Sequence, residues 1–256
     1  MRVSRLYVSF SLAVGQQVAL DEDNAHYVRT VLRLRQSAEV ILFNGLGGEY
    51  LGKIDEVSRK SVLITMTVWT DRSVESHLKV TLGLGIARGD RMDFSVQKAV
   101  ELGVNAMTPL ITERCQVQIK GEKKVQRLLH WQKIAQHATE QSGRTCLPIL
   151  NNIEHLTQWV GQQKGLKVFL DPYADKSLND LTPIEGHVTL LTGPEGGFSA
   201  VERDIAKAAG FIPVRMGARI LRTETASLAA LAAVQVLWGD FGIVEAPSST
   251  IVREIV

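Results

Sequence analysis

From Lys79 onward, short apolar runs alternate with helical segments, and this alternation constrains the fold more than any other feature. Five runs are short and almost continuously apolar, as strands buried on both faces are: Val80–Ala87, Ala106–Ile111, Val168–Leu170, Val188–Leu191 and Phe211–Val214. Apolar strands that alternate with helices are typical of a mostly parallel sheet covered by helices on both faces. We therefore predict an α/β fold for this part of the chain.

Two helix signals stand in the last third of the chain. Ser199-Ala-Val-Glu202 matches a capping box, which predicts that a helix begins there. The stretch Ala226–Trp238 is apolar nearly all round and predicts a buried last helix, with Thr223 or Thr225 as its N-cap. At 13 residues, this longest apolar run is too short to span a bilayer.

The first 70 or so residues have a different sequence pattern, in which short β-branched runs are separated by turns. Val40–Phe43, Glu49–Ile54 and Val62–Trp69 have the composition of strands, and Asn44–Gly48 is a turn signal between the first two. This pattern indicates a small antiparallel barrel or sandwich with one short helix. The polar stretch Asp71–His77 is a plausible linker to the α/β part.

These patterns predict a small β-rich domain over 1–72, an α/β domain over 73–242 and a tail over 243–256. The net charge of +2 is small, so a local patch would have to attract any nucleic acid. The two cysteines, Cys115 and Cys146, have no metal-ligand spacing, and we expect no metal. No signal peptide is evident, and we expect a cytoplasmic protein.

The strand Val188–Leu191 runs directly into a glycine-rich loop, Thr192-Gly-Pro-Glu-Gly-Gly197. Glycines at the carboxyl end of a parallel strand let the backbone approach a ligand closely. The sequence lacks both the phosphate loop G-x-x-x-x-G-K-[ST] and a G-x-G-x-x-G at the first strand. A nucleoside without phosphate is therefore a better candidate ligand than a phosphate. Taken alone, the loop is equally compatible with a tight strand-to-helix connection.

A second candidate segment, Met216-Gly-Ala-Arg-Ile-Leu-Arg-Thr-Glu224, follows the next strand. Gly217 permits a sharp turn, and Ile220 and Leu221 are apolar enough to line a pocket. Arg219 and Arg222 lie three residues apart. A loop with solvated arginines before a core helix would have the same composition, so this segment alone leaves both interpretations open.

Three further segments, Arg88–Gly103, Gln132–Arg144 and His26–Leu34, join the two loops in a resemblance to a known family. In their order and their residues, the segments resemble the SPOUT methyltransferases, the class with a deep trefoil knot. More narrowly, they resemble the RsmE family, which methylates N3 of a uridine in 16S ribosomal RNA of the small ribosomal subunit. The resemblance covers nearly the whole chain up to about Gly242.

The resemblance implies a C-terminal SPOUT α/β trefoil-knot domain, preceded by a small β-rich PUA-like barrel that binds RNA. In such proteins the chain threads through its own loop, although protein chains are almost always unknotted. The class usually forms homodimers through its last helix. The implied cofactor is S-adenosyl-L-methionine, held against the knot loops. The matching residues here are Leu170, Thr192, Gly193, Pro194, Glu195, Gly196, Gly197, Met216, Gly217, Ile220, Leu221 and Ala226.

The implied reaction sets requirements for the catalytic residues. Uracil N3 must lose its proton as the methyl group arrives, and negative charge then spreads onto the O2 and O4 carbonyls. A guanidinium stays charged and presents a rigid fork, so we expect Arg222, or else Arg88, to face these oxygens. Glu224 is a candidate proton acceptor, although a first-turn carboxylate stabilised by the helix dipole is the more ordinary interpretation.

RNA contacts are expected mainly from the first domain. Arg29 and Arg33 are four residues apart, so on a short helix they would share a face, with His26 one turn earlier. Residues 1–70 hold eight Lys/Arg and seven Asp/Glu, so a solvated helix is the alternative. The candidate RNA contacts are Arg2, Arg5, His26, Arg29, Arg33 and Arg144.

Two other functions remain open at this point. A nicotinamide-dependent oxidoreductase shares the alternation of strands and helices, but here the glycine loop follows a late strand rather than the first one. An RNA-binding protein that kept the knotted fold without catalysis would have the same motifs for RNA.

Overall fold

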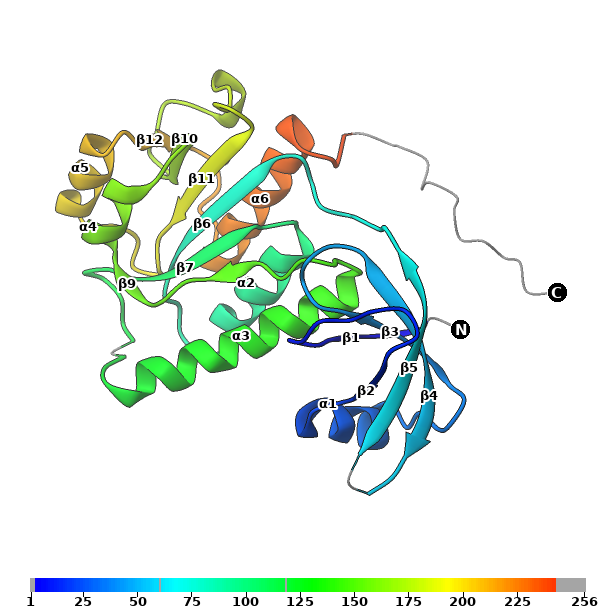
Figure 1. The fold of residues 1–256 in the computed structure, drawn as a ribbon. Helices are drawn as coiled ribbons and strands as arrows, with labels where there is room; N and C mark the ends of the chain where they lie inside the picture. The colour runs from blue at the N-terminus through cyan, green and yellow to red at the C-terminus, as the bar shows by residue number, and fades with distance from the viewer. Residues whose placement is uncertain (1–2, 60, 118, 243–256) are drawn as a thin grey trace. The chain divides into compact units, whose positions relative to one another are not determined.

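A computed structural model describes residues 3–59, 61–117 and 119–242 of the chain (Figure 1). Two compact units form: Met1–Glu75 with Leu129–Pro148, and Ser76–Leu128 with Ile149–Val256. Residues 129–148, which the predicted domain boundaries place in the α/β domain, thus group with the N-terminal unit. The predicted tail over 243–256 and the candidate RNA contact Arg2 lie outside the described residues.

The first unit contains a five-stranded sheet with the order β1-β3-β4-β5-β2. The strands are β1 (Ser4–Tyr7), β2 (Gln17–Ala19), β3 (Glu39–Phe43), β4 (Glu49–Val57) and β5 (Val62–Thr70). Neighbouring strands are antiparallel except β1 and β3, which are parallel. The β-rich prediction is confirmed, but a purely antiparallel sheet is not found. The chain leaves β1 for β2 and a helix before it returns to β3, and a crossover of this kind joins parallel strands.

One face of this sheet is covered by a short helical segment, α1 (Glu22–His26), which continues as a π-helical turn, η1 (Tyr27–Val31). Val28 is fully buried in the same core as Leu6 and Ile64. Arg33 lies beyond the turn, with φ +52°. The prediction that Arg29 and Arg33 share a helical face is therefore wrong, because the helical segment ends before Arg33 and the chain turns there towards β3.

The second unit is built on a parallel sheet with the strand order β12-β10-β11-β6-β7-β8, and β9 also pairs with β7. All of its pairings are parallel, which confirms the predicted sheet. The strands are β6 (Lys79–Gly85), β7 (Ala106–Ile111), β8 (Ile149–Leu150), β9 (Glu154–His155), β10 (Leu166–Leu170), β11 (His187–Thr192) and β12 (Ile212–Val214).

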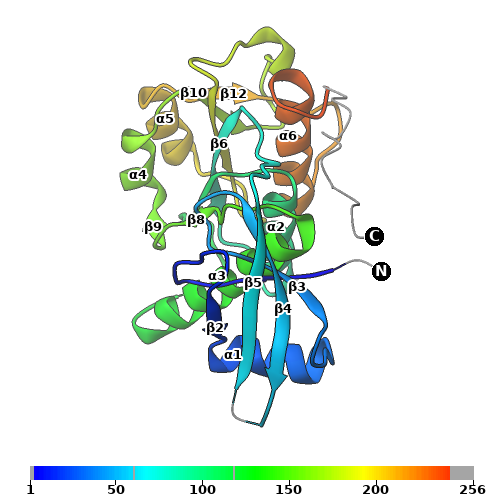
Figure 2. The ribbon, with the colours of Figure 1, turned by 45° about the vertical axis from the view of Figure 1, so that its right-hand side comes forward.

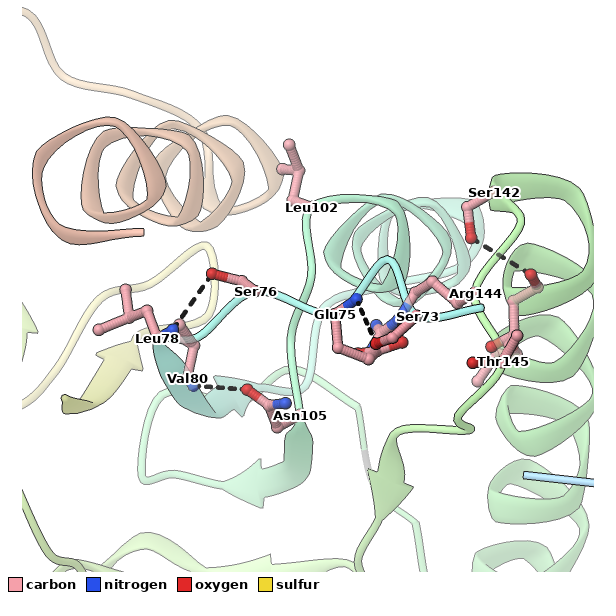
Figure 3. Close-up of polar contacts among 12 residues, drawn as sticks. Ser73, Glu75, Ser76, Leu78, Val80, Leu102, Asn105, Ser142, Arg144 and Thr145 are labelled. Carbon is pink, nitrogen blue, oxygen red and sulfur yellow. Dashed lines mark hydrogen bonds and ion pairs between the residues drawn. The ribbon is translucent and has the colours of Figure 1, made fainter. Parts of the chain in front are cut away.

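Asn105 fixes the start of β6 beside β7. Its side-chain Oδ1 accepts a hydrogen bond from the backbone N–H of Val80 at 2.7 Å, and its own N–H donates to the Val80 carbonyl at 2.9 Å (Figure 3). Ser76 accepts from the N–H of Leu78 at 3.2 Å just before the strand. These bonds fix the register of β6 against β7. The register in turn fixes where the carboxyl end of β6 lies.

Helices cover both faces of the parallel sheet, with α4 and α5 on one face and α2 and α6 on the other (Figures 1 and 2). Trp159 of α4, Phe169 of β10 and Phe211 belong to one buried apolar cluster, which also includes Ala206 of α5. The helical elements are α2 (Asp90–Glu101), α3 (Glu122–Ser142), α4 (Leu156–Trp159), α5 (Ala200–Ala208) and α6 (Thr223–Trp238), with 3₁₀ turns η2 (Val160–Gln162) and η3 (Leu178–Asp180). None of the helices in the described part is long and apolar enough to cross a membrane.

Of the two predicted helix starts, that of α5 is found as predicted and that of α6 is not. The capping box is confirmed, because Ser199 Oγ accepts from the N–H of Glu202 at 3.1 Å and Glu202 Oε2 accepts from the N–H of Ser199 at 2.9 Å. The predicted cap of the last helix by Thr223 or Thr225 is wrong. Arg222 is the N-cap of α6, without a side-chain bond, and Thr223 is already helical.

Candidate methyl-transfer site

A cavity of about 500 Å³ opens at the carboxyl ends of β10, β11 and β12. These three strands are neighbours in one parallel sheet, so the loops that follow them meet at one edge, where α/β proteins bind ligands. The cavity is lined by Arg114, Leu170, Asp171, Pro172, Tyr173, Thr192, Gly193, Pro194, Glu195, Gly196, Gly197, Phe198, Arg203, Val214, Met216, Gly217, Arg219, Ile220, Leu221, Arg222, Thr223 and Ala226.

Every residue that the sequence nominated for the cofactor lies on this cavity, from Leu170 to Ala226. The catalytic candidates are divided. Arg222 is an exposed residue of the lining, whereas Arg88 and Glu224 do not line the cavity. Arg88 is exposed and donates from Nη1 to Gln116 Oε1 at 3.3 Å. Glu224 stands in the first turn of α6 and has a buried Oε2 without a hydrogen-bond partner in the described part of the chain.

Thr192, the last residue of β11, has an unsatisfied hydroxyl. The residue is 1% exposed, and its Oγ1 has no hydrogen-bond partner among the described residues. A buried polar atom left unpaired costs about 1–3 kcal/mol. Since Thr192 lines the cavity, a bound ligand with polar groups can remove this cost. The glycine backbone and the apolar side chains of the lining, such as Leu170 and Ile220, suit an uncharged nucleoside.

Close packing explains why the loop after β11 is rich in glycine. Gly196 lies against Arg114, where a Cβ atom would be 2.9 Å from the Arg114 Cβ. Gly197 has φ +64° and donates its N–H to the Pro194 carbonyl at 2.9 Å, which closes a turn. Gly85, at the end of β6, backs the loop: a Cβ there would be 2.5 Å from the backbone nitrogen of Pro194. A side chain at Gly85 would thus collide with the backbone of the loop, and a side chain at Gly196 would collide with Arg114.

Glu195 connects the same loop to the start of α2. Its Oε1 accepts from the backbone N–H of Arg88 at 3.1 Å and forms an ion pair with Arg91 Nη1 at 3.2 Å. Burial raises the pKa of the Glu195 carboxyl, but the N–H groups of Arg88 and Glu195 and the charge of Arg91 outweigh burial. The pKa therefore lies below its ordinary value. A carboxylate held charged in this way is a poor base and a good anchor for the loop.

Four polar residues of the lining were not predicted from the sequence, namely Arg114, Asp171, Tyr173 and Arg203. Asp171 Oδ2 forms an ion pair with Arg203 Nη1 at 3.0 Å, and its Oδ1 accepts from the N–H of Tyr173 at 2.9 Å. A signal for Asp171 was present, because it directly follows β10 as the glycine loop follows β11. Arg203 carries no such signal, since only the folded α5 brings it to the cavity.

Two of the nominated RNA contacts are buried within the first unit. Arg144 is 4% exposed and donates from Nε to Glu75 Oε1 at 2.9 Å (Figure 3). Arg5 is 9% exposed, pairs with Glu49, and donates to the Arg144 carbonyl at 3.1 Å. These contacts give both guanidinium groups a structural role in that unit.

The remaining nominated contacts are more accessible. His26 and Arg33 are exposed, and Arg29 is half-buried, with Nη1 donating to the carbonyl oxygens of Ser58 at 3.0 Å and Arg59 at 2.7 Å. His26 and Arg29 line a second hollow of about 780 Å³, which lies in the first unit beside Tyr27, Lys133 and His137. Within the described ranges, no group of three His, Cys, Asp or Glu side chains is arranged to hold a metal ion.

The parallel sheet and the cavity formed by its two loops agree with the fold of the SPOUT class of methyltransferases. Residues 74–235 match the family model described as an RNA methyltransferase domain, and residues 20–67 match the RNA methyltransferase PUA domain. The chain belongs to this family of RNA methyltransferases.

Named relatives agree with the family. The chain is 35% identical, over 93% of its length and 98% of the relative's, to the ribosomal RNA small subunit methyltransferase E of Buchnera aphidicola subsp. Schizaphis graminum. It resembles a solved putative methyltransferase of Legionella pneumophila in complex with SAM (39% identity, TM-score 0.91, 94% and 100% of the two chains covered). It also resembles the solved ribosomal RNA small subunit methyltransferase E of Neisseria gonorrhoeae bound to S-adenosyl methionine (37% identity, TM-score 0.88, 94% and 100% of the two chains covered). These matches favour an RNA methyltransferase over an oxidoreductase or a non-catalytic RNA-binding protein.

Proposed function

We propose that the chain methylates N3 of a uridine in 16S ribosomal RNA, with S-adenosylmethionine held in the cavity at the ends of β10, β11 and β12. The observation that carries the proposal is the cavity itself: all nominated cofactor residues line it, and the buried Thr192 hydroxyl there lacks a partner in the described part of the chain. Relatives that carry the name ribosomal RNA small subunit methyltransferase E support the substrate.

The residues divide between holding the cofactor and assisting the transfer. S-adenosylmethionine, when bound, supplies a methyl group activated by its sulfonium. The glycine loop from Thr192 to Gly197 and the segment from Met216 to Leu221 would hold it through backbone groups and apolar side chains. Arg222, exposed on the lining, would stabilise the negative charge that develops on the uracil oxygens as N3 loses its proton. Arg88 is the second candidate for this role, and Glu224, with its unpaired Oε2, is the candidate proton acceptor.

Residues 1–72 would bind RNA and residues 73–242 would carry out the transfer. His26, Arg29 and Arg33 remain the proposed RNA contacts of the first part, whereas Arg5 and Arg144 would act by stabilising that unit. Phosphate contacts position an RNA without reading its sequence, and the target base would be read in the cavity. The location of such an enzyme would be the cytoplasm, where ribosomes assemble.

A homodimer is part of the proposal. The last turn of α6 exposes Val236 and Leu237, and Phe241 beyond it is 49% exposed. Neighbouring exposed apolar side chains of this kind favour a protein partner. Sedimentation velocity would give the mass of a dimer, and a monomer at micromolar concentration would contradict this part.

The function is tested by mass spectrometry of 16S RNA nucleosides from a strain that lacks the protein. We expect 3-methyluridine to disappear from that RNA and to return when the gene is restored. Unchanged 3-methyluridine would contradict the proposed function. In addition, S-adenosylhomocysteine should raise the melting temperature of the purified protein, and NAD should not.

A further inference from the structure

The amino end of α3 with the two residues before it, residues 120–128, forms a strongly basic segment of the second unit, drawn in green in Figure 1. Four cations, Lys120, Lys123, Lys124 and Arg127, stand against one acid, Glu122, and the net charge of the segment is +3. Because the whole chain carries only +2, the rest of the chain has a net charge of −1. The segment alone thus carries more net positive charge than the whole chain.

These cations are available for a partner. Lys120, Lys123 and Arg127 are exposed, and Lys124 is half-buried. Within residues 3–59, 61–117 and 119–242, none of the four forms an ion pair with a carboxylate. A segment that keeps four unpaired cations on its surface has the electrostatics of a site for a polyanion.

The spacing of the cations fits a chain of phosphates better than a single small anion. Lys123 and Arg127 are one helical turn apart on the same face, about 6 Å along the axis. The segment also lies close to the cavity along the chain. Arg114 lines the cavity and donates from Nη1 to the Gly196 carbonyl at 3.2 Å. Lys120 is the sixth residue after Arg114, so their Cα atoms are at most about 22 Å apart.

We propose that residues 120–128 bind the phosphate backbone of the substrate RNA beside the target uridine. This inference rests on the proposed function and adds a docking surface on the methyl-transfer unit itself. Arg114 would continue the path from this surface to the cavity. Backbone contacts so near the reacting base would hold the RNA in register while the base enters the cavity.

The test is the triple variant Lys123→Gln, Lys124→Gln, Arg127→Gln, titrated with in vitro-transcribed 16S RNA at several salt concentrations. Each cation that contacts a phosphate of a single strand contributes about −0.7 to the slope of log K against log salt. We therefore expect the slope to become less steep by about 2, with weaker binding at every salt concentration. The affinity for S-adenosylmethionine and the melting temperature should stay unchanged, because these side chains are on the surface.

A control variant carries the same loss of charge elsewhere in the unit: Lys79→Gln, Lys164→Gln, Lys207→Gln, all at exposed lysines. It should retain the wild-type slope. An unchanged slope in the α3 variant, or equal losses in both variants, would overturn the inference. So would binding of the segment to phosphatidylserine vesicles without any loss of RNA binding in the α3 variant. Absence of methyl transfer by the wild-type protein would instead contradict the proposed function, and RNA binding would still decide the role of the segment.

Discussion

Glu195 and Arg91 form an ion pair, with 3.2 Å between Oε1 and Nη1, that ties the glycine loop after β11 to the first turn of α2. The loop lies on the cavity, whereas Arg91 does not line it. The pair therefore acts on the cavity through the position of the loop. Because the Glu195 side chain is only 19% exposed, solvent screens this pair less than a typical surface pair.

We predict that Glu195→Gln weakens binding of S-adenosylmethionine about 3- to 10-fold, the effect of losing roughly 1 kcal/mol of loop stabilisation. Arg91→Gln should have a similar effect, although Arg91 is not on the lining. Isothermal titration calorimetry of both variants measures this. Wild-type affinity in both would show that the pair does not position the loop.

The pH dependence of this anchor has a definite sign. The folded-state pKa of Glu195 lies below its ordinary value of 4.5, so the pair contributes its full stabilisation above that pH. The contribution is lost as pH falls through the depressed pKa of the folded state. The melting temperature of the wild-type protein should therefore fall more steeply with decreasing pH than that of Glu195→Gln. Parallel curves between pH 3 and 6 would contradict this assignment.

Thr192 offers a test of the cavity itself. Thr192→Val keeps the shape of the side chain but removes the unpaired hydroxyl. If that hydroxyl bonds the cofactor, the variant should bind S-adenosylmethionine up to about 10-fold more weakly, since a hydrogen bond contributes about 0.5–1.5 kcal/mol. It should also be slightly more stable without ligand. Thr192→Ser is the matched control and should retain most of the affinity, whereas equal affinity in the valine variant would remove Thr192 from the binding site.

Arg222 is expected to act on the transfer rather than on cofactor binding. Arg222→Ala should lower kcat by about 10²- to 10³-fold, the usual effect of losing one donor to a developing negative charge. Its Kd for S-adenosylmethionine should change less than about 2-fold, well below the effect of a lost hydrogen bond to a charged group. Arg219→Ala, three residues earlier on the same lining, serves as control. Equal losses of kcat in both variants would indicate disruption of the segment and not a catalytic role for Arg222.

His137 is expected to titrate above its ordinary pKa. Its Nδ1 lies 3.1 Å from Glu140 Oε2, and the bond to this carboxylate raises the pKa of the imidazole despite partial burial. The pair thus stabilises the first unit fully below pH 6.5, the ordinary value, and the stabilisation is lost as pH rises through the higher folded-state pKa. NMR titration of His137 should show this, with a lower pKa in Glu140→Gln. No difference between the two proteins would refute the pairing.

The ion pair of Arg144 with Glu75 predicts a structural phenotype instead of an RNA-binding one. Both side chains are largely buried, at 5% and 18% exposure. Breaking a buried ion pair by removing one of its partners costs about 3–5 kcal/mol. Glu75→Gln should therefore lower the free energy of unfolding by about that amount in a urea titration. Lys133→Gln breaks an exposed pair with Asp23 and should cost less than about 1 kcal/mol. Similar costs for the two variants would contradict this account.

Sequence patterns predicted the elements that local composition determines. The five apolar runs became strands of the parallel sheet, because strands buried on both faces must be apolar throughout. The capping box at Ser199 formed because its partners are three residues apart. The two loops were predicted as a site from their place after neighbouring strands, and they do line one cavity.

What the sequence missed depends on residues far apart in the chain. Arg5 and Arg144 looked like surface cations, but their carboxylate partners are 44 and 69 residues away and bury them. Arg33 looked helical, and its φ of +52° arises from the return of the chain towards β3. Arg203 reaches Asp171 only through the packing of α5 beside β10. For Arg5, Arg144 and Arg203, a long-range contact overrode the local pattern.

The central claim is tested most directly by methyl transfer in vitro. Small ribosomal subunits from a strain lacking the protein, and 16S RNA extracted from them, would be incubated with the purified protein and methyl-labelled S-adenosylmethionine. Nucleoside mass spectrometry would then locate the label. We predict one labelled methyl group per 16S RNA, recovered as 3-methyluridine, and almost none with Arg222→Ala. No transfer to either substrate, or a label on any other atom than uridine N3, would contradict the account.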